Sequence, residues 1–192
     1  VVKIRVRSNY TCPPSNIIYV NHNATGLNNG SSWADAYTNL QDALGLVCEN
    51  VTQVWVANGS YFPDLGGGYN LGDRKANFNL QKNLAIYGGF DGTETAISER
   101  NISSNPTILS GDIGTVDDNS DNSYHVVIGA GDVGSASIND FIIEGGNSNA
   151  TEGQIVNGFM MVGDNGGGMY NNNASPRLTN IIVRGNNSAW NG

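Results

Sequence analysis

The chain has 192 residues, 39% of them hydrophobic, so it can bury a substantial core within one domain. Nine Lys and Arg residues against 17 Asp and Glu residues give a net charge of -8, which disfavours nucleic-acid binding because that requires a cationic surface. The longest apolar runs have about four to six residues, far below the roughly 20 needed to cross a bilayer. The 26 glycines lie between these short runs, a pattern typical of many short β-strands separated by turns.

The first seven residues, VVKIRVR, alternate between apolar and basic side chains. This pattern predicts a half-buried strand with Val2, Ile4 and Val6 on one face. Two prolines then interrupt regular structure. We therefore assign residues 1–16 to a strand and linker and residues 17–192 to the main domain. The strand either pairs within this domain, belongs to a preceding domain, or adds to a neighbouring molecule as an assembly strand.

Cys12 and Cys48 are the two cysteines of the chain. A pair is too small for a zinc site, and the two histidines lie at no useful ligand spacing. The sequence leaves two alternatives, which are one disulfide in an exported protein or two buried free thiols.

Residues 31–48 carry the helical pattern of the chain. Their apolar side chains recur at 3.6-residue spacing, and Ser31 or Ser32 can cap the first turn. We expect this helix to cover the open apolar end of the strands that follow.

An internal repeat appears in the second half of the chain. Residues 135–148 and 175–188 align without gaps at an offset of 40. The matched apolar positions are Ile138 with Leu178, Phe141 with Ile181, and Ile143 with Val183. Glu144 and Arg184 occupy one equivalent position with opposite charges, which marks it as outward. The segment IVNGFMMVG is expected to supply one more strand between the two repeats. Short strands of this kind bury their apolar faces by stacking in successive coils, so the pattern predicts a solenoid.

Five segments, taken in order, resemble a known family: IIYVNHNATGLNNGSSWADAYTNLQDAL, VWVANGSYFP, LAIYGGFDGTET, NPTILSGDIG and GGGMYNNNASPRLTNIIVRGN. They look like the right-handed parallel β-helix, pectate-lyase-like proteins of bacterial cell surfaces, which are related to the polymorphic outer membrane protein repeats. The resemblance covers roughly residues 17–192. It implies an all-β parallel β-helix with an N-terminal capping α-helix, and a secreted or cell-surface module that is commonly part of a longer chain. It implies no catalytic residue, because the matching positions are turn and core residues.

Four acidic side chains gather in the segment SGDIGTVDDNSDNSYH, namely Asp112, Asp117, Asp118 and Asp121. Hard cations bind several oxygen ligands, so this segment is a candidate calcium loop, and calcium is the one cofactor that the sequence suggests. The spacing does not match the helix-loop-helix calcium motif. The alternative is a plain solvated acidic loop.

Nine Asn-x-Ser/Thr triplets are candidate glycosylation sites if the protein is secreted by a glycosylating organism. They begin at Asn9, Asn23, Asn29, Asn50, Asn58, Asn101, Asn149, Asn173 and Asn186.

These observations favour an exported, non-enzymatic structural or adhesive module of a cell surface or extracellular fibre. The last apolar run has no visible cap, so we expect either further coils or another molecule to cover it, and head-to-tail assembly by strand addition follows as a hypothesis. The second class is a carbohydrate-binding module that uses aromatic side chains such as Tyr61, Phe62, Tyr69 and Trp190. The third is a polysaccharide lyase or hydrolase, which is disfavoured because no coherent set of carboxylates and bases can be assembled.

Overall fold

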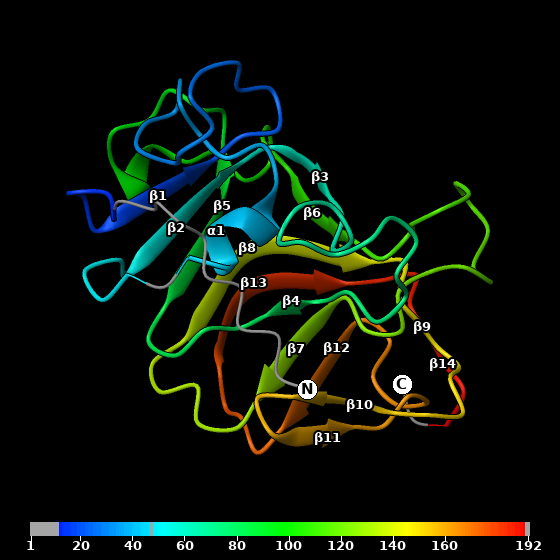
Figure 1. Cartoon of the computed structure of the whole chain (residues 1–192). Helices are drawn as coiled ribbons and strands as arrows, with labels where there is room; N and C mark the ends of the chain where they lie inside the picture. The colour runs from blue at the N-terminus through cyan, green and yellow to red at the C-terminus, as the bar shows by residue number, and fades with distance from the viewer. Residues whose placement is uncertain (1–11, 47, 191–192) are drawn as a thin grey trace.

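The computed structural model describes residues 12–46 and 48–190. The strand predicted around Val2, Ile4 and Val6 therefore lies outside the described residues. The regular secondary structure of the described part is almost entirely β, with one short α-helix and one 3-10 turn between long loops (Figure 1).

The largest sheet has seven strands, and every pair in it is parallel. Its path runs β1-β2-β5-β8-β6-β3, and β13 joins on β8. The strands are β1 (Ile17–Val20), β2 (Gln53–Ala57), β3 (Gly59–Tyr61), β5 (Ala85–Phe90), β6 (Thr107–Ser110), β8 (Ser137–Glu144) and β13 (Arg177–Val183). These are largely the apolar runs that the sequence marks, because short stretches rich in Val, Ile and aromatic residues fit a pleated surface.

Strand β8 is bent, and the bend joins two parts of the large sheet. Asp140 has a left-handed backbone, with φ of 65°, and β13 repeats this conformation at Asn180, with φ of 50°. Before the bend β8 pairs with β5, and after it with β6. The Asn180 side-chain amide donates a hydrogen bond to Asp140 Oδ1 at 2.9 Å, so the two bends are tied to each other.

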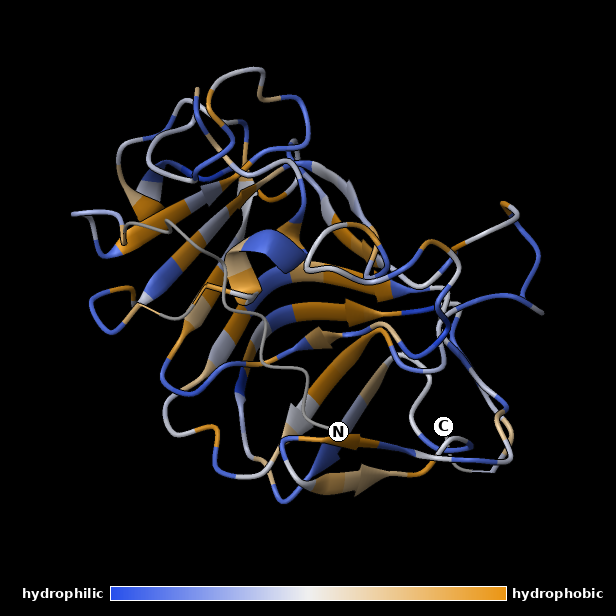
Figure 2. Ribbon diagram, in the orientation of Figure 1, coloured by the Kyte–Doolittle hydropathy of each residue, from blue (hydrophilic) through white to orange (hydrophobic). Residues whose placement is uncertain are grey.

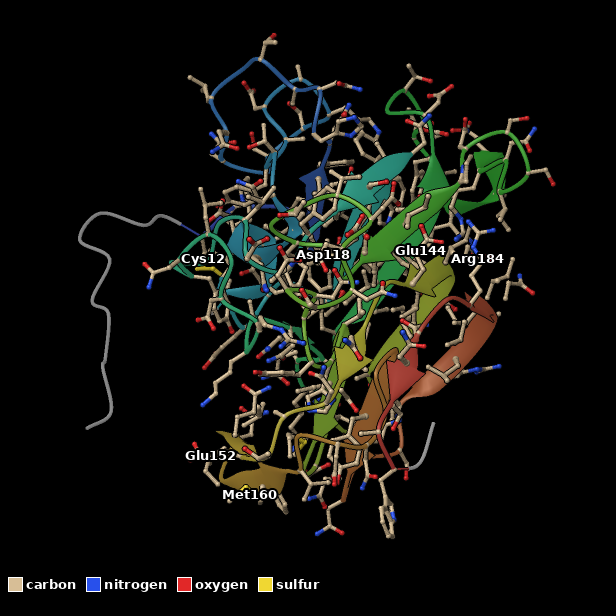
Figure 3. All side chains as sticks on the ribbon, turned by 90° about the vertical axis from the view of Figure 1, so that its right-hand side faces the viewer. Cys12, Asp118, Glu144, Glu152, Met160 and Arg184 are labelled. Carbon is tan, nitrogen blue, oxygen red and sulfur yellow. A yellow bond between two sulfur atoms is a disulfide. The ribbon has the colours of Figure 1, made fainter. Side chains whose placement is uncertain are left out.

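The register between β8 and β13 follows the internal repeat. Ile138 lies opposite Leu178, Phe141 opposite Ile181, and Ile143 opposite Val183. At the end of β8, Glu144 Oε2 accepts a hydrogen bond from Nε of Arg184, the residue after β13, at 2.8 Å, and the two side chains point toward each other in Figure 3. The alignment at an offset of 40 therefore identified true neighbours.

Three smaller sheets complete the fold. A three-stranded parallel sheet has the order β12-β7-β4, and the other two sheets contain two strands each. The strands are β4 (Phe78–Asn79), β7 (Val127–Ala130) and β12 (Met169–Asn172), with β9 (Asn147–Ser148) on β14 (Asn187–Ser188) and β10 (Gln154–Val156) on β11 (Phe159–Met161).

The main core lies between the large sheet and the three-stranded sheet, which together form a half-barrel (Figure 1). Inward side chains of β1, β2, β5 and β8 meet Phe78 and Val127 from the facing sheet. Figure 2 shows apolar residues concentrated in these strands, while the connecting loops are mostly hydrophilic. The hairpin β10–β11 covers the opposite face of β7, where Met161 packs against Ile128.

The outer face of the large sheet carries a second, aromatic layer. Tyr19 of β1 packs on Trp33, with ring centroids 4.8 Å apart, and Trp55 of β2 stacks on Phe90 of β5 at 4.7 Å. The Trp33 indole donates to the carbonyl of Glu94 at 2.8 Å. These contacts hold the loops that contain Trp33 and Glu94 against the sheet.

The predicted right-handed parallel β-helix with a capping helix is wrong. The strands divide into four sheets of unequal size, the large sheet branches at β8, and one sheet is antiparallel, so the chain does not wind through uniform coils. The helix predicted over residues 31–48 is reduced to α1 (Leu40–Leu44), which packs against β1 and β4. The apolar residues N-terminal to α1 serve other contacts, because Trp33 joins the aromatic layer and Tyr37 forms a parallel bridge with Val20.

The segment IVNGFMMVG is also different from the single strand that we expected. It forms the antiparallel pair β10–β11 around Asn157 and Gly158, which have φ of 50° and 84°. An Asn-Gly pair with both residues at positive φ is the turn that a two-residue hairpin favours.

Candidate functional site

The exposed apolar end of the large sheet is the candidate functional site, and β13 forms it. Of the described strands, only β8 pairs with β13. Leu178, Ile182 and Val183 are 46%, 55% and 56% exposed. Their register partners in β8 include Ile138 and Ile143, which are fully buried. The same apolar pattern is thus core in one strand and surface in the next.

An acidic pocket lies at the carboxyl end of β13. It has a volume of about 390 Å³, and Asp112, Asp117 and Glu144 line it together with Gly185. Glu144 is the carboxylate paired with Arg184. Polar and negatively charged groups therefore border the apolar surface of β13 on one side.

The four predicted calcium ligands accept backbone hydrogen bonds or line the acidic pocket. Asp112 accepts the Asp117 N–H at 3.2 Å on each carboxylate oxygen, and Asp121 accepts the Thr115 N–H at 2.8 Å. Asp118 accepts the Ser120 N–H at 2.9 Å, and hydrogen bonds from Ser120 lower the pKa of its carboxyl group. Within residues 12–46 and 48–190, no group of three or more acidic, His or Cys side chains has an arrangement that could hold a metal ion.

A larger open pocket, of about 500 Å³, contains the other acidic segment, with Asp91, Glu94 and Glu99 among its lining residues. Glu94 accepts the N–H groups of Asp91 and its two successors at 2.7–3.1 Å. Glu99 accepts the N–H groups of Thr95 and Ala96, and these bonds lower its pKa. A glycosidase general acid needs a raised pKa. The lowered pKa of Glu99 is the opposite of what a general acid requires, and the Glu94 carboxylate stabilises the turn at Asp91 through these N–H groups.

The structure joins Cys12 and Cys48 in a disulfide with Cα atoms 5.8 Å apart, so of the two alternatives it has the crosslink (Figure 3). It places most of the candidate glycosylation sites on the surface, while Asn9 lies outside the described residues. The exposed ones are Asn23, Asn29, Asn50, Asn101, Asn149 and Asn173, and Asn58 and Asn186 are half-buried. The Asn186 amide is fully used, since it donates to two carbonyls and accepts the Gly146 N–H at 2.8 Å.

The aromatic candidates for sugar contacts separate into two kinds. Tyr61 is buried and donates its hydroxyl to the Ala57 carbonyl at 3.0 Å, and Phe62 is half-buried. Tyr69 and Trp190 are exposed. Only the latter two have rings that a ligand can reach.

His125 is buried, and its contacts were not predicted from the sequence. Its Nδ1 faces the Gly166 carbonyl at 3.2 Å, and its ring stacks on Tyr170 with centroids 5.4 Å apart. Burial lowers the pKa of His125, and this effect outweighs the opposing influence of nearby backbone carbonyls. His125 lies two residues before β7 (Val127–Ala130), and nothing in its local sequence indicates that the ring is buried.

In the described part of the chain, no helix has both the length and the apolar character needed to traverse a bilayer. Comparisons with protein-family models, curated proteins and solved structures returned no match to this chain.

Proposed function

We propose that this chain is a non-enzymatic structural module of an extracellular or cell-surface assembly, and that it associates with copies of itself through β13. The exposed apolar surface of β13 carries this proposal. Large exposed apolar surfaces mark interaction sites, and an unpaired strand edge is a template for another strand. The Cys12–Cys48 disulfide supports an exported location, since such crosslinks persist in oxidising compartments.

The proposed occupant of the edge is the segment VVKIRVR of a second copy. Its apolar side chains, Val2, Ile4 and Val6, alternate as the edge of a half-buried sheet requires. Backbone hydrogen bonds supply affinity in such strand addition, and alternate side chains supply specificity.

Charge supports this choice of occupant. The segment carries three of the nine basic residues of the chain and none of its 17 acidic residues. The pocket at the carboxyl end of β13 contains Asp112, Asp117 and Glu144. A strand added parallel to β13 would bring its last basic side chains toward this acidic pocket.

Burial of apolar side chains makes a modest favourable contribution to the free energy of association. Burying a Val, Leu or Ile side chain completely stabilises by roughly 1.5–3 kcal/mol. Leu178 and Val183 pair with the fully buried Ile138 and Ile143 and are about half exposed, so covering these two contributes about 2 kcal/mol, to which the backbone hydrogen bonds of the added strand are added.

The test is sedimentation velocity over a range of protein concentrations. The parent chain should form larger species as concentration rises, and Val183→Asp should remain monomeric because it places a charge in the interface. Leu27→Asp is the matched control, since it charges a strongly exposed apolar residue outside β13 and should associate like the parent. Deleting residues 1–8 should abolish association while leaving the melting temperature unchanged.

Two results would overturn the proposal. If the parent chain stays monomeric at every concentration, the edge of β13 does not mediate self-association. Association that survives both Val183→Asp and the deletion uses some other surface.

A further inference from the structure

Residues 154–165 form a flap on the three-stranded sheet. The flap consists of the hairpin β10–β11 and the four residues after it, and Figure 1 shows the hairpin beside β7 and β12 at the bottom of the molecule. Glycine adjoins both ends of the flap, as Gly153 before it and a run of three glycines after it. The first of that run, Gly166, has φ of 61°, in the left-handed region that glycine adopts most readily. The backbone at this end can therefore act as a hinge.

The flap is held to the rest of the molecule by few contacts. Its one fully buried apolar side chain is Met161, which packs in a small cluster separate from the main core. Ile155 and Met160 lie opposite each other in the hairpin and are 62% and 51% exposed. The Asn172 side chain donates to the Met160 carbonyl at 2.8 Å. Local opening is easiest where few apolar side chains are buried, so the flap can move while the main core stays intact.

His125 lies beneath the flap and is 1% exposed. Its Nδ1 faces the carbonyl of Gly166 at 3.2 Å, and the carbonyls of Val162 and Asn165, both in the flap, are close enough to influence its pKa. The face of the ring stacks on Tyr170 of β12. In the described part of the chain, the shielded Nε2 has no hydrogen-bond partner. The flap and its hinge thus separate the imidazole from water.

Among the described residues, no carboxylate is placed to compensate a proton on this ring. The groups that shift the pKa of His125 are backbone carbonyls and burial itself, and burial dominates. The flap contains one acidic residue, Asp164, which is not among those groups. Tyr170 faces the ring with its aromatic face and carries no charge that could pair with an imidazolium. Arg74 donates to the carbonyl of Asn122, three residues before His125, and adds positive charge to this region.

Polar atoms of the flap itself also favour opening. Gln154 Nε2 and Asn165 Oδ1 are shielded from solvent and have no hydrogen-bond partner among the described residues. A polar group that is buried without a partner costs free energy, and water supplies the partner once the group is exposed. The same holds for Nε2 of His125 beneath the flap. The closed form alone carries these costs, so they lower the free energy that opening requires.

We propose that residues 154–165 are an acid-sensitive flap, which protonation of His125 releases from β7 while the large sheet stays folded. Opening gives the charged imidazole access to water and exposes Met161 together with Ile128, its partner in the small cluster. The module would therefore present a new apolar surface in an acidic medium. This switch goes beyond the proposed self-association through β13 and does not depend on it.

Acid shifts the equilibrium toward the open flap. A histidine in water has a pKa of about 6.5, and burial holds the pKa of His125 in the closed form below that value. Protons therefore bind the open form more tightly. The ratio of open to closed molecules should rise about ten-fold for each pH unit below about 6.5, until the pH reaches the pKa of the closed form. Above about pH 6.5 the ratio should not change.

The test is hydrogen–deuterium exchange measured by mass spectrometry from about pH 7.5 down to about pH 5, at one low protein concentration. Exchange rates are expressed relative to those of unstructured peptides, which removes the intrinsic pH dependence of exchange. In the parent chain, the protection of residues 154–165 should fall about ten-fold per pH unit below about 6.5. The protection of β2 and β5, in the main core, should stay unchanged.

The two histidines of the chain provide a variant and its matched control. His125→Phe keeps an aromatic ring against Tyr170 but cannot take up a proton, so its flap should stay closed over the whole pH range. His22 is exposed and contacts the ring of Tyr61 outside the flap, so His22→Phe should open like the parent. If His125→Phe does not fold, NMR of the parent gives a second measurement, in which the His125 ring and the flap amides should titrate with the same midpoint.

Three outcomes would overturn this inference. Flap protection in the parent that is unchanged down to about pH 5 shows that no acid-driven opening occurs. An equal loss of protection in His125→Phe assigns the acid response to other groups. A loss in β2 and β5 that accompanies the loss in the flap is global unfolding and not the movement of a flap. None of these results depends on association through β13, so failure of one proposal is distinguishable from failure of the other.

Discussion

The ion pair between Arg100 and Asp140 lies at the bend of the large sheet, and we expect it to stabilise that bend. Arg100 Nη1 contacts Asp140 Oδ2, and the two side chains are only 15% and 2% exposed. The other carboxylate oxygen of Asp140 accepts the Asn180 amide. Replacing this carboxylate would leave the guanidinium without its counterion and loosen the pairing of β8 with β13 at the bend.

Asp140→Asn isolates the charge, because Asn has the same size and tolerates the left-handed backbone at this position, where φ is 65°. Breaking a buried ion pair by removing one partner costs about 3–5 kcal/mol. Arg100 keeps its bonds to the carbonyls of Gly88 and Ile97, at 3.2 and 2.9 Å, so we expect the lower end, about 3 kcal/mol. With a urea m value of roughly 3 kcal/mol/M, the unfolding midpoint should fall by about 1 M.

The matched control is the pair between Lys82 and Asp132, whose side chains are 58% and 72% exposed. Asp132→Asn should leave the midpoint unchanged within error, because exposed ion pairs contribute little. Urea unfolding followed by tryptophan fluorescence measures both variants. Equal midpoints for the two variants would refute the view that burial makes the Arg100–Asp140 pair stabilising. The double variant Arg100→Met/Asp140→Asn should recover part of the loss, since it removes the stranded charge.

Two further predictions concern stability. His125 has a folded-state pKa below its unfolded value of about 6.5, so protonation favours unfolding; stability should be flat above pH ~6.5 and fall by about 1.4 kcal/mol per pH unit as the pH drops from there toward the folded pKa. His125→Phe should have a shallower pH dependence in urea titrations between about pH 5 and 7, and equal slopes for both proteins would contradict this assignment. The Cys12–Cys48 disulfide closes a loop with a sequence separation of 36, which predicts a loss of about 4 kcal/mol for the Cys12→Ser/Cys48→Ser variant. Thermal melts of that variant and of the parent with and without reductant measure the loss, and a parent unaffected by complete reduction would speak against it.

The sequence predicted the strands well and their overall arrangement poorly. Runs such as those of β1, β2 and β5 were recognised as strands because their residue pattern is a local signal. The register of β13 on β8 was predicted because the repeat is visible in the sequence. The branching of the large sheet at β8 depends on the left-handed backbone of Asp140, and an Asp in an apolar run does not by itself signal a bend.

The helix prediction failed because a helical period arose from unrelated contacts. Trp33 packs outward on Tyr19, while Tyr37 lies beside Val20 and is buried. Two apolar residues four positions apart thus belong to different layers. Tertiary packing overrides a periodic pattern when each residue has its own partner.

The candidate site on β13 could be predicted only in part from the sequence. The β13 residues Leu178 and Val183 were identified as apolar repeat positions, but their exposure depends on which strands are neighbours.

The opposite charges of Glu144 and Arg184 have a consequence for folding fidelity. A chain with an internal repeat can mispair while it folds, because one copy of the repeat can occupy the place of the other. If β8 of a second molecule took the place of β13 beside β8, Glu144 would face Glu144, and like charges at directly opposed positions are destabilising. Correct pairing instead forms the 2.8 Å ion pair. One charge reversal between otherwise similar strands thus favours the pairing of β8 with β13 over the pairing of β8 with a second β8.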